Sequence, residues 1–312
     1  MNHVYRLIDA QIAQSSVVTI GVFDGVHRGH QDLIRRLVEN AHSNNRLAIV
    51  LTFFPHPDVV LRGLTGRYYL TSPEQRAAEL IKLGVDYVIT HEFNETLRQM
   101  RAADFVDQLV THLKIEELWV GSDFAMGYKR EGDVGFLRRE GERKGFTVET
   151  VELLHSDDNG QIISSTAIRE AIQRGAVEQA NELLGRAYSL NGKVVPGDAR
   201  GRQIGFPTAN IAVWDQQVLP ENGVYAGWVE IDGQSHKAVT NIGIRPTFAG
   251  TEVRLETHLL DFDRDIYEKE ISISFVARLR GEQKFNGIDM LVAQIHKDVA
   301  AARQLLEAQE TS

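Results

Sequence analysis

The sequence contains no cysteine. Disulfides, thiolate nucleophiles and cysteine-ligated zinc or iron–sulfur sites are therefore excluded, a composition that suits a reducing compartment. No apolar run approaches the ~18 residues needed to cross a bilayer, and the opening MNHVYRLIDAQIAQ lacks the basic-then-apolar plan of a signal peptide. We therefore expect a soluble, cytoplasmic protein that has no membrane partner.

Basic residues are fewer than acidic ones, with 34 Lys and Arg against 43 Asp and Glu and a formal net charge of -9. Nucleic-acid binders neutralise phosphates with Lys and Arg, so we expect no nucleic-acid partner. The chain has 312 residues, of which 43% are hydrophobic, and this is typical of soluble globular proteins. Because one core usually serves about 100 to 200 residues, the length predicts two domains.

The first half of the chain alternates β-rich runs with helical patterns. Runs such as SVVTIGVF, RLAIVLTFF, VDYVITHEF and IEELWVG are separated by segments such as GHQDLIRRLVENAH, SPEQRAAELIKLG and AADFVDQLVTHLK. This rhythm predicts repeated βαβ units on a parallel sheet. A further strand, GFTVETVELL, and two helices, ISSTAIREAIQRG and AVEQANELLGRAY, are expected to follow.

From about Leu190 the pattern changes to short alternating runs between Gly, Pro and Asp turns, namely YSLNGKVV, GVYAGWVEI, HKAVTNIGI, VRLETHLLDF and EISISFVARLR. Such runs predict a small antiparallel barrel. The tail, IDMLVAQIHKDVAAARQLLEAQ, has a period near 3.6 and predicts a closing amphipathic helix. We place the domain boundary near Arg186, giving domains 1–186 and 187–312.

The segment GVFDGVHRGH lies between an apolar β-rich run and a helical pattern. It is therefore expected at the carboxyl end of a parallel strand, where α/β sheets bind ligands. Gly21, Gly25 and Gly29 let the backbone approach phosphates, and the helix start offers free N–H groups. His27 and His30 are three residues apart, so both imidazoles can donate to charge on the same phosphates. Alternatively, the two histidines form half of a metal site or are ordinary polar surface residues. A zinc site needs a third protein ligand, and none is near them in the sequence.

Two later segments carry groups suited to phosphate. ISSTAIR, residues 163–169, places three hydroxyls at a helix start with Arg169 one turn inside, which suits a phosphate site or a plain N-cap. GSDFAMGYKREGD carries Lys129 and Arg130 in a Gly-flanked loop, which suits a triphosphate or equally solvent.

In the second half, VVPGDARGRQIGFPTAN is a Gly- and Arg-rich loop that ends in Pro-Thr-Ala-Asn. Its glycines with Arg200 and Arg202 can wrap phosphates, and the Thr208 hydroxyl and Asn210 amide oxygen are hard ligands suited to Mg²⁺. The structural alternative is a turn with an Asx-type hydrogen bond at Asn210.

Taken together, GxFDGxHxGH and the later ISSTxIR resemble the nucleotidyltransferase module of the bacterial bifunctional riboflavin kinase/FMN adenylyltransferase (FAD synthetase) family. TFFPHP, LGVDYVI, VGSDFAMG and LLGRAY follow the same order as in that family, with departures from its pattern at Phe54 and Met126. GFPTAN is similar to the riboflavin kinase signature, and NIGIRPTF, LETHLLDF and LRGEQKF follow in that family's order.

The resemblance implies a Rossmann-like α/β nucleotidyltransferase domain followed by a small antiparallel β-barrel kinase domain with a C-terminal helix. The barrel is expected to phosphorylate riboflavin to FMN with ATP, and the first domain to transfer AMP from ATP to FMN, giving FAD and pyrophosphate. Both steps are expected to use Mg²⁺. The small-molecule partners are then riboflavin, FMN and ATP, and no obligate protein partner is expected. The alternative is an FMN adenylyltransferase whose barrel senses flavin without catalysis.

By resemblance, Glu256 takes the place of the catalytic carboxylate, which can accept the proton of the riboflavin 5′-hydroxyl. The alternative for Glu256 is an exposed strand carboxylate. His27 and His30 are the catalytic residues of the first domain. ATP and phosphate binding there is assigned to Gly21, Phe23, Asp24, Gly29, Asp123, Arg130, Ser164, Ser165, Thr166 and Arg169. ATP and flavin binding in the barrel is assigned to Gly201, Arg202, Gly205, Pro207, Thr208, Asn210 and Asn241, with Mg²⁺ on Thr208 and Asn210.

Overall fold

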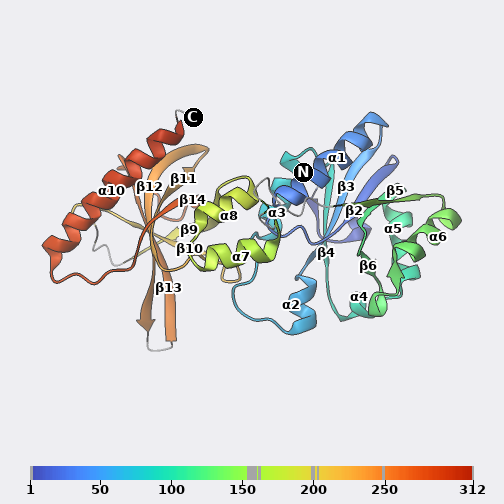
Figure 1. Cartoon of the computed structure of the whole chain (residues 1–312), viewed down its shortest axis with the longest axis horizontal. Helices are drawn as coiled ribbons and strands as arrows, with labels where there is room; N and C mark the ends of the chain where they lie inside the picture. The colour runs from blue at the N-terminus through green and yellow to red at the C-terminus, as the bar shows by residue number, and fades with distance from the viewer. Residues whose placement is uncertain are drawn as a thin grey trace. The chain divides into compact units, whose positions relative to one another are not determined.

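The computed structural model of the protein describes residues 3–152, 160, 163–197, 201, 204–247 and 250–310. Its chain forms two compact units, which divide between Ser165 and Thr166. Figure 1 shows an α/β unit in the first half of the chain and a barrel with a long closing helix in the second. The predicted fold class is confirmed.

A six-stranded sheet forms the centre of the first unit, and every strand pair in it is parallel. In sheet order the strands are β1 (His3–Val4), β4 (Tyr87–Glu92), β3 (Leu47–Phe54), β2 (Ser16–Ile20), β5 (Ile115–Gly121) and β8 (Thr147–Val151). Chain order reverses at β2, between β3 and β5. The carboxyl end of β2 is therefore the switch point at which such sheets bind ligands.

The helices of this unit cover both faces of the sheet, because successive strand residues point to opposite sides. Val17 and Val50 pack on the helices α1 (Arg28–Ser43) and α3 (Pro73–Lys82). Val18 and Leu51 pack on the opposite face, against α5 (Ala102–Leu113) and α6 (Val134–Lys144). The shorter elements are η1 (Leu7–Asp9), α2 (Pro57–Arg62), α4 (Glu95–Gln99), β6 (Ala125–Met126), η2 (Tyr128–Arg130) and β7 (Gly132–Asp133).

The second unit begins with two short helices, α7 (Ser165–Gln173) and α8 (Val177–Leu184). Helix α8 is fixed to the barrel, since Asn181 Nδ2 donates to the carbonyl of Phe275 at 2.8 Å and Glu178 accepts from the N–H of Arg278 at 3.0 Å. The compact units therefore divide after the first residue of α7, and both helices group with the barrel. The expected boundary near Arg186, drawn where the sequence pattern changes, stays a prediction.

Six antiparallel strands close the barrel, as the alternating pattern predicted. In barrel order they are β10 (Ala209–Val213), β13 (Gly250–Leu259), β12 (Gln234–Thr247), β11 (Gly223–Ile231), β14 (Glu270–Gly281) and β9 (Tyr188–Val195). The closing helix, α10 (Ile288–Glu310), buries Ala302 against Val224, Ala226 and Val239 of the barrel. Ala209 and Asn210, expected at the end of a loop, form the start of the strand β10.

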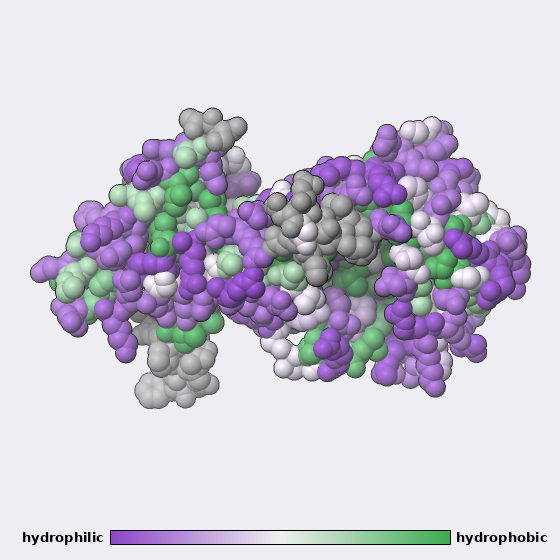
Figure 2. All heavy atoms as spheres, in the orientation of Figure 1, coloured by the Kyte–Doolittle hydropathy of each residue, from purple (hydrophilic) through white to green (hydrophobic). Residues whose placement is uncertain are grey.

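Hydrophilic side chains cover most of the face shown in Figure 2, and apolar side chains show between them in separate patches. Among the helices that the structure describes, none combines the length and the apolar character that a membrane-spanning segment needs.

Leu37 tests the core between α1 and the sheet, because its side chain has no exposed area. We expect Leu37→Ala to lower the free energy of unfolding of the first unit by about 2–5 kcal/mol, since it removes buried surface and leaves a cavity. Leu61→Ala is the control, because Leu61 of α2 is 51% exposed. Denaturant titration of both variants measures the effect, and equal midpoints for the two would contradict this core assignment.

Candidate active sites

The loop after β2 turns sharply between Gly21 and His27. Phe23, Gly25 and Val26 have φ angles of 52°, 81° and 41°. Positive φ is free for glycine but unfavourable for Phe and Val, so the surroundings must hold these two residues in place. Two main-chain hydrogen bonds contribute, from the N–H of Gly21 to the carbonyl of Leu51 at 3.1 Å and from the N–H of Val26 to the carbonyl of Phe23 at 3.0 Å.

Asp24 anchors this loop through a buried carboxylate with 1% exposure. The carboxylate accepts from the N–H groups of Leu70 and Thr71 at 3.1 and 3.2 Å, and from the Thr71 hydroxyl at 3.2 Å. Its oxygens are therefore used by the protein. The ATP-binding role predicted for Asp24 stays a prediction.

His27 and His30 lie together at the start of α1, which also includes the buried Gly29. Their rings stack with centroids 3.6 Å apart, and the ring of Phe23 meets His30 edge-on at 5.1 Å. His27 is the N-cap, because its Nδ1 accepts from the N–H of His30 at 3.3 Å. In the neutral ring, the proton must then be on Nε2, which is the donor nitrogen of His27.

The pKa of His30 lies well below its ordinary value. Burial of the ring is the main cause, followed by the charges of His27 and Arg76. Among the described residues, none forms a hydrogen bond with the buried Nδ1 of His30. In the described part of the chain, no group of three or more His, Asp or Glu side chains is placed to hold a metal ion. The lowered pKa keeps His30 neutral at neutral pH, and a neutral imidazole can donate one ring N–H.

The hydroxyl-rich segment meets this loop through Ser165. Its hydroxyl donates to the carbonyl of Asp24 at 2.8 Å. Ser164 and Ser165 are half-buried, Thr166 is exposed and Arg169 is 9% exposed. Thr166 and Arg169 belong to the second compact unit, so their predicted contact with the phosphates near His27 stays a prediction.

The predicted loop residues Asp123 and Arg130 lie together, since Arg130 Nη2 donates to the carbonyl of Asp123 at 2.9 Å. Both side chains are exposed. Glu131 fixes the same loop to α5 by accepting from the N–H of Ala102 at 2.8 Å. A Cβ added to Gly127 would lie 2.6 Å from that same nitrogen, so glycine permits the close approach. Binding of phosphate by this loop stays a prediction.

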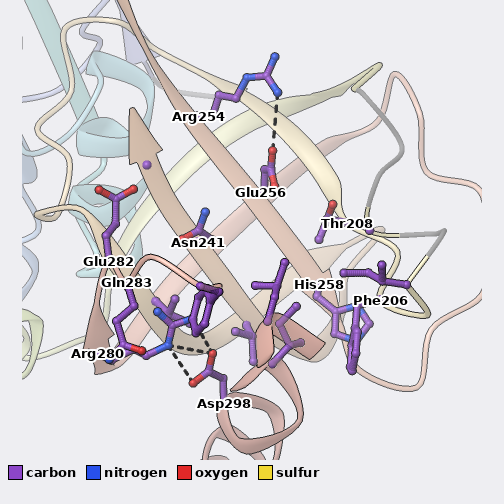
Figure 3. A pocket seen from close by; sticks show the side chains of 18 of the residues that line it. Phe206, Thr208, Asn241, Arg254, Glu256, His258, Arg280, Glu282, Gln283 and Asp298 are labelled. Carbon is purple, nitrogen blue, oxygen red and sulfur yellow. Dashed lines mark hydrogen bonds and ion pairs between the residues drawn. The ribbon is translucent and has the colours of Figure 1, made fainter. Parts of the chain in front are cut away.

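In the barrel unit, a cavity of about 790 Å³ contains most of the predicted kinase residues. Gly201, Thr208, Asn210, Asn241 and Glu256 all line it. Figure 3 shows Thr208, Asn241 and Glu256 around the same opening, with Arg280 and Asp298 on another part of the wall. The structure therefore brings together residues from β10, β12 and β13 that are far apart in the sequence.

Strand register places Glu256 of β13 directly opposite Asn210 of β10 and Asn241 of β12. Side chains opposite one another on neighbouring strands are about 5 Å apart and share a face. One carboxylate thus lies between two amides. Glu256 also pairs with Arg254, two residues earlier, at 3.7 Å, and its side chain is 34% exposed. A half-exposed carboxylate in a cavity remains accessible to a substrate hydroxyl.

The loop before β10 shapes one edge of the cavity. The carbonyl of Gly201 accepts from the N–H groups of Ile204 and Phe206 at 3.2 and 2.8 Å, and Gly205 has a φ of 87°. His258 Nδ1 donates to the carbonyl of the exposed Pro207 at 2.8 Å. Arg202, predicted to bind phosphate, lies outside the described residues.

Thr208 and Asn210 fit the predicted Mg²⁺ site by their chemistry and surroundings. Among the described residues, none forms a hydrogen bond with the Thr208 hydroxyl or the Asn210 amide. A Cβ on Gly201 would lie 3.2 Å from the Thr208 hydroxyl, and a Cβ on Gly197 would overlap the Asn210 amide. The two glycines therefore leave the two oxygen ligands open, and hard oxygen ligands of this kind suit Mg²⁺.

Several cavity residues were not predicted from the sequence. Arg280 Nε and Nη2 donate to the buried carboxylate of Asp298 on α10 at 2.9 to 3.1 Å. Arg280 also lies under the ring of Phe285, 5.6 Å from its centroid. In β13, the sequence could have indicated that Arg254 and His258 line the same cavity as Glu256, because residues two apart on a strand share a face.

Two family models match the chain, FAD synthetase over residues 9–167 and riboflavin kinase over residues 184–306. A bifunctional riboflavin kinase/FMN adenylyltransferase from Pseudomonas fluorescens is 43% identical, covering 93% of this chain and 92% of its own. The protein so named from Escherichia coli K12 is 40% identical over 93% of both chains. A crystal structure described as a macrolide-efflux protein from Streptococcus pneumoniae is 31% identical, with a TM-score of 0.86, covering 96% of this chain and 98% of that chain.

The lowered pKa of His30 makes the free energy of unfolding of the first unit depend on pH. Its folded-state pKa lies below the unfolded value of about 6.5, so the unfolded chain binds the proton more readily. Stability is therefore full above pH 6.5 and falls as the pH drops toward the folded pKa, by up to about 1.4 kcal/mol per pH unit. Denaturant unfolding at pH 7.5 and 5.5 should show a smaller loss in His30→Gln. Equal losses in the two proteins would contradict the assignment, since His3 and His91 titrate in both.

Proposed function

The chain belongs to the bifunctional riboflavin kinase/FMN adenylyltransferase family, and we propose that the residues gathered at its two sites carry out that family's two reactions. The barrel phosphorylates riboflavin to FMN with ATP. The α/β unit transfers AMP from ATP to FMN and gives FAD and pyrophosphate. The single observation that supports the kinase assignment best is the row Asn210, Glu256 and Asn241 beside Thr208 in the barrel cavity.

In the kinase step, the riboflavin 5′-oxygen attacks the γ-phosphorus of ATP. The bond from that phosphorus to the bridging oxygen of ADP breaks, and the hydroxyl proton passes to Glu256. A carboxylate flanked by two amides is suited to this task, because the amides orient substrate oxygens while the carboxylate accepts the proton. Arg254 forms an ion pair with this carboxylate, with Nη1 3.7 Å from Glu256 Oε1.

Thr208 and Asn210 are proposed to hold Mg²⁺ through their side-chain oxygens. When bound, the ion neutralises charge on the phosphates of ATP. The described loop residues Gly201 and Gly205, with Pro207, are proposed to shape the ATP side of the cavity. Arg202, which lies outside the described residues, is proposed from the sequence alone to bind on the same side.

In the adenylyl transfer, an FMN phosphate oxygen attacks the α-phosphorus of ATP, and pyrophosphate leaves as the α–β bridging bond breaks. His27 and His30 are proposed to donate hydrogen bonds to the charge that develops on the α-phosphate. Gly21, Phe23, Asp24 and Gly29 shape the loop, and the proposed phosphate contacts come from Asp123, Arg130, Ser164, Ser165, Thr166 and Arg169. No nucleophile is required from the protein.

The rival assignment, an adenylyltransferase with a flavin-sensing barrel, is not favoured, since both family models match in order and the barrel retains its carboxylate and amides. We also propose a cytoplasmic enzyme without a nucleic-acid, membrane or obligate protein partner. The acidic net charge of -9 supports the first of these exclusions.

Glu256→Gln tests the kinase assignment. It keeps the size of the side chain but removes the base, so we expect kcat for FMN formation from riboflavin to fall by about 10²-fold or more. FAD formation from supplied FMN should stay unchanged in the same protein. Glu230→Gln is the matched control, because Glu230 is an exposed carboxylate on β11. Chromatography of the flavin products measures both reactions, and normal FMN formation by Glu256→Gln would reject the base assignment.

His27→Asn tests the adenylyl-transfer assignment. Asparagine is a good N-cap, so α1 should keep its first turn while the imidazole is lost. We expect kcat for FAD formation from FMN to fall by about 10²- to 10³-fold, because one donor to the transition state is removed. FMN formation should be unaffected. His42→Asn, at the exposed end of the same helix, is the control; a matching loss there would show that the effect is not specific to the site.

A further inference from the structure

Arg76 of α3 is a charged residue inside the core of the first unit. Its side chain has no exposed area, and the other buried residues of the helix are Pro73, Ala77 and Leu80. An unpaired buried charge would cost several kcal/mol, so a guanidinium is retained in a core only where partners surround it. The partners of Arg76 indicate what it does.

One guanidinium nitrogen of Arg76 forms hydrogen bonds at the carboxyl ends of both β2 and β3. Nη1 lies 3.0 Å from the carbonyl of Val22, 3.1 Å from the hydroxyl of Thr52 and 3.2 Å from the carbonyl of Phe53. Thr52 in turn donates to the carbonyl of Val22 at 2.7 Å. The main chain is therefore fixed at the point where it leaves the sheet and enters the loop of His27.

A second nitrogen of Arg76 faces the anchor of that loop. Nη2 lies 3.7 Å from the buried Asp24 carboxylate, which also accepts from Leu70 and Thr71. The Thr71 hydroxyl accepts from the N–H of Gly25 at 3.2 Å. The cation thus balances the carboxylate that holds the loop. Val22 is bonded directly to Arg76, and Gly25 is linked through Thr71 to the carboxylate of Asp24.

We propose that Arg76 is a positioning residue of the adenylyl-transfer site, which fixes the main chain from Val22 to Asp24 so that His27 and His30 face the reacting phosphates. This inference rests on the function proposed for the α/β unit. Phe23 and Val26 hold unfavourable positive φ angles in this turn, so the turn depends on such external ties. The charge of Arg76 also contributes to the lowered pKa of His30, which keeps that ring a neutral donor.

The test compares Arg76→Met and Arg76→Lys in the full-length protein, with both reactions measured. Imidazoles placed for the transition state affect turnover more than substrate binding. We expect Arg76→Met to lower kcat for FAD formation about 10- to 100-fold, the scale of a small misplacement, with KM for ATP within about threefold. Arg76→Lys should recover part of the loss because it restores a buried cation. FMN formation should be unchanged in both variants.

Lys82→Met is the matched control, since Lys82 lies on the same helix with a side chain that is 72% exposed. Thr52→Val, which removes one acceptor of Arg76 at constant size, provides a second variant should Arg76→Met fail to fold. We expect it to lower kcat for FAD formation several-fold with unchanged KM, a loss consistent with one hydrogen bond. An unchanged kcat in folded Arg76→Met, or in Thr52→Val, overturns the inference.

A purely structural role has a different signature. Arg76→Met and Arg76→Lys would then lose thermal stability and FAD formation together, without rescue by lysine, and this outcome also overturns the inference. The proposed function fails separately: if the unsubstituted protein forms no FAD from FMN, ATP and Mg²⁺, the assignment of the α/β unit is wrong. If the unsubstituted protein forms FAD and Arg76→Met equals it, only the role of Arg76 is rejected.

Discussion

The function proposed for the first site requires that no negative charge lies where the phosphates are proposed to bind. The loop GVFDGVHRGH contains one carboxylate, Asp24, and an exposed carboxylate there would repel ATP. The fold turns this side chain inward, where Leu70, Thr71 and Arg76 satisfy it. The same contacts hold the positive φ angles of Phe23 and Val26.

The two sites solve the problem of positioning in different ways. In the α/β unit, a parallel sheet ends in loops, so its groups are placed by the main chain and by buried ties beneath it. In the barrel, antiparallel register places side chains directly, and Glu256 lies between Asn210 and Asn241 without a loop to position it. A one-residue slip of β13 would turn Glu256 to the opposite face, so closure of the barrel protects the site.

Sequence periodicity predicted most elements because it reports burial. Helix α6 was not predicted, because only Leu137 and Gly141 are buried in it and its apolar periodicity is weak. Strand β10 was not predicted, because it begins within the turn-forming residues of PTAN. Motifs predicted the candidate residues Glu256, Thr208 and His27. Three features could not be predicted, because they depend on contacts between segments that are distant in the sequence. They are the row Asn210, Glu256 and Asn241, the burial of the Asp24 carboxylate, and the partners of Arg76.

Each unit ties a helix to its candidate site through a buried carboxylate–guanidinium pair, with the charges exchanged. Arg76 on α3 reaches Asp24 in the loop, whereas Asp298 on α10 holds Arg280 at the end of β14. Such pairs add little net stability compared with apolar packing, but breaking one leaves an uncompensated charge. Such a pair is suited to positioning a functional site, because a charged pair is stable in fewer geometric arrangements than an apolar contact is. Since each unit contains both partners of its own pair, a substitution in one pair is expected to leave the reaction of the other unit intact.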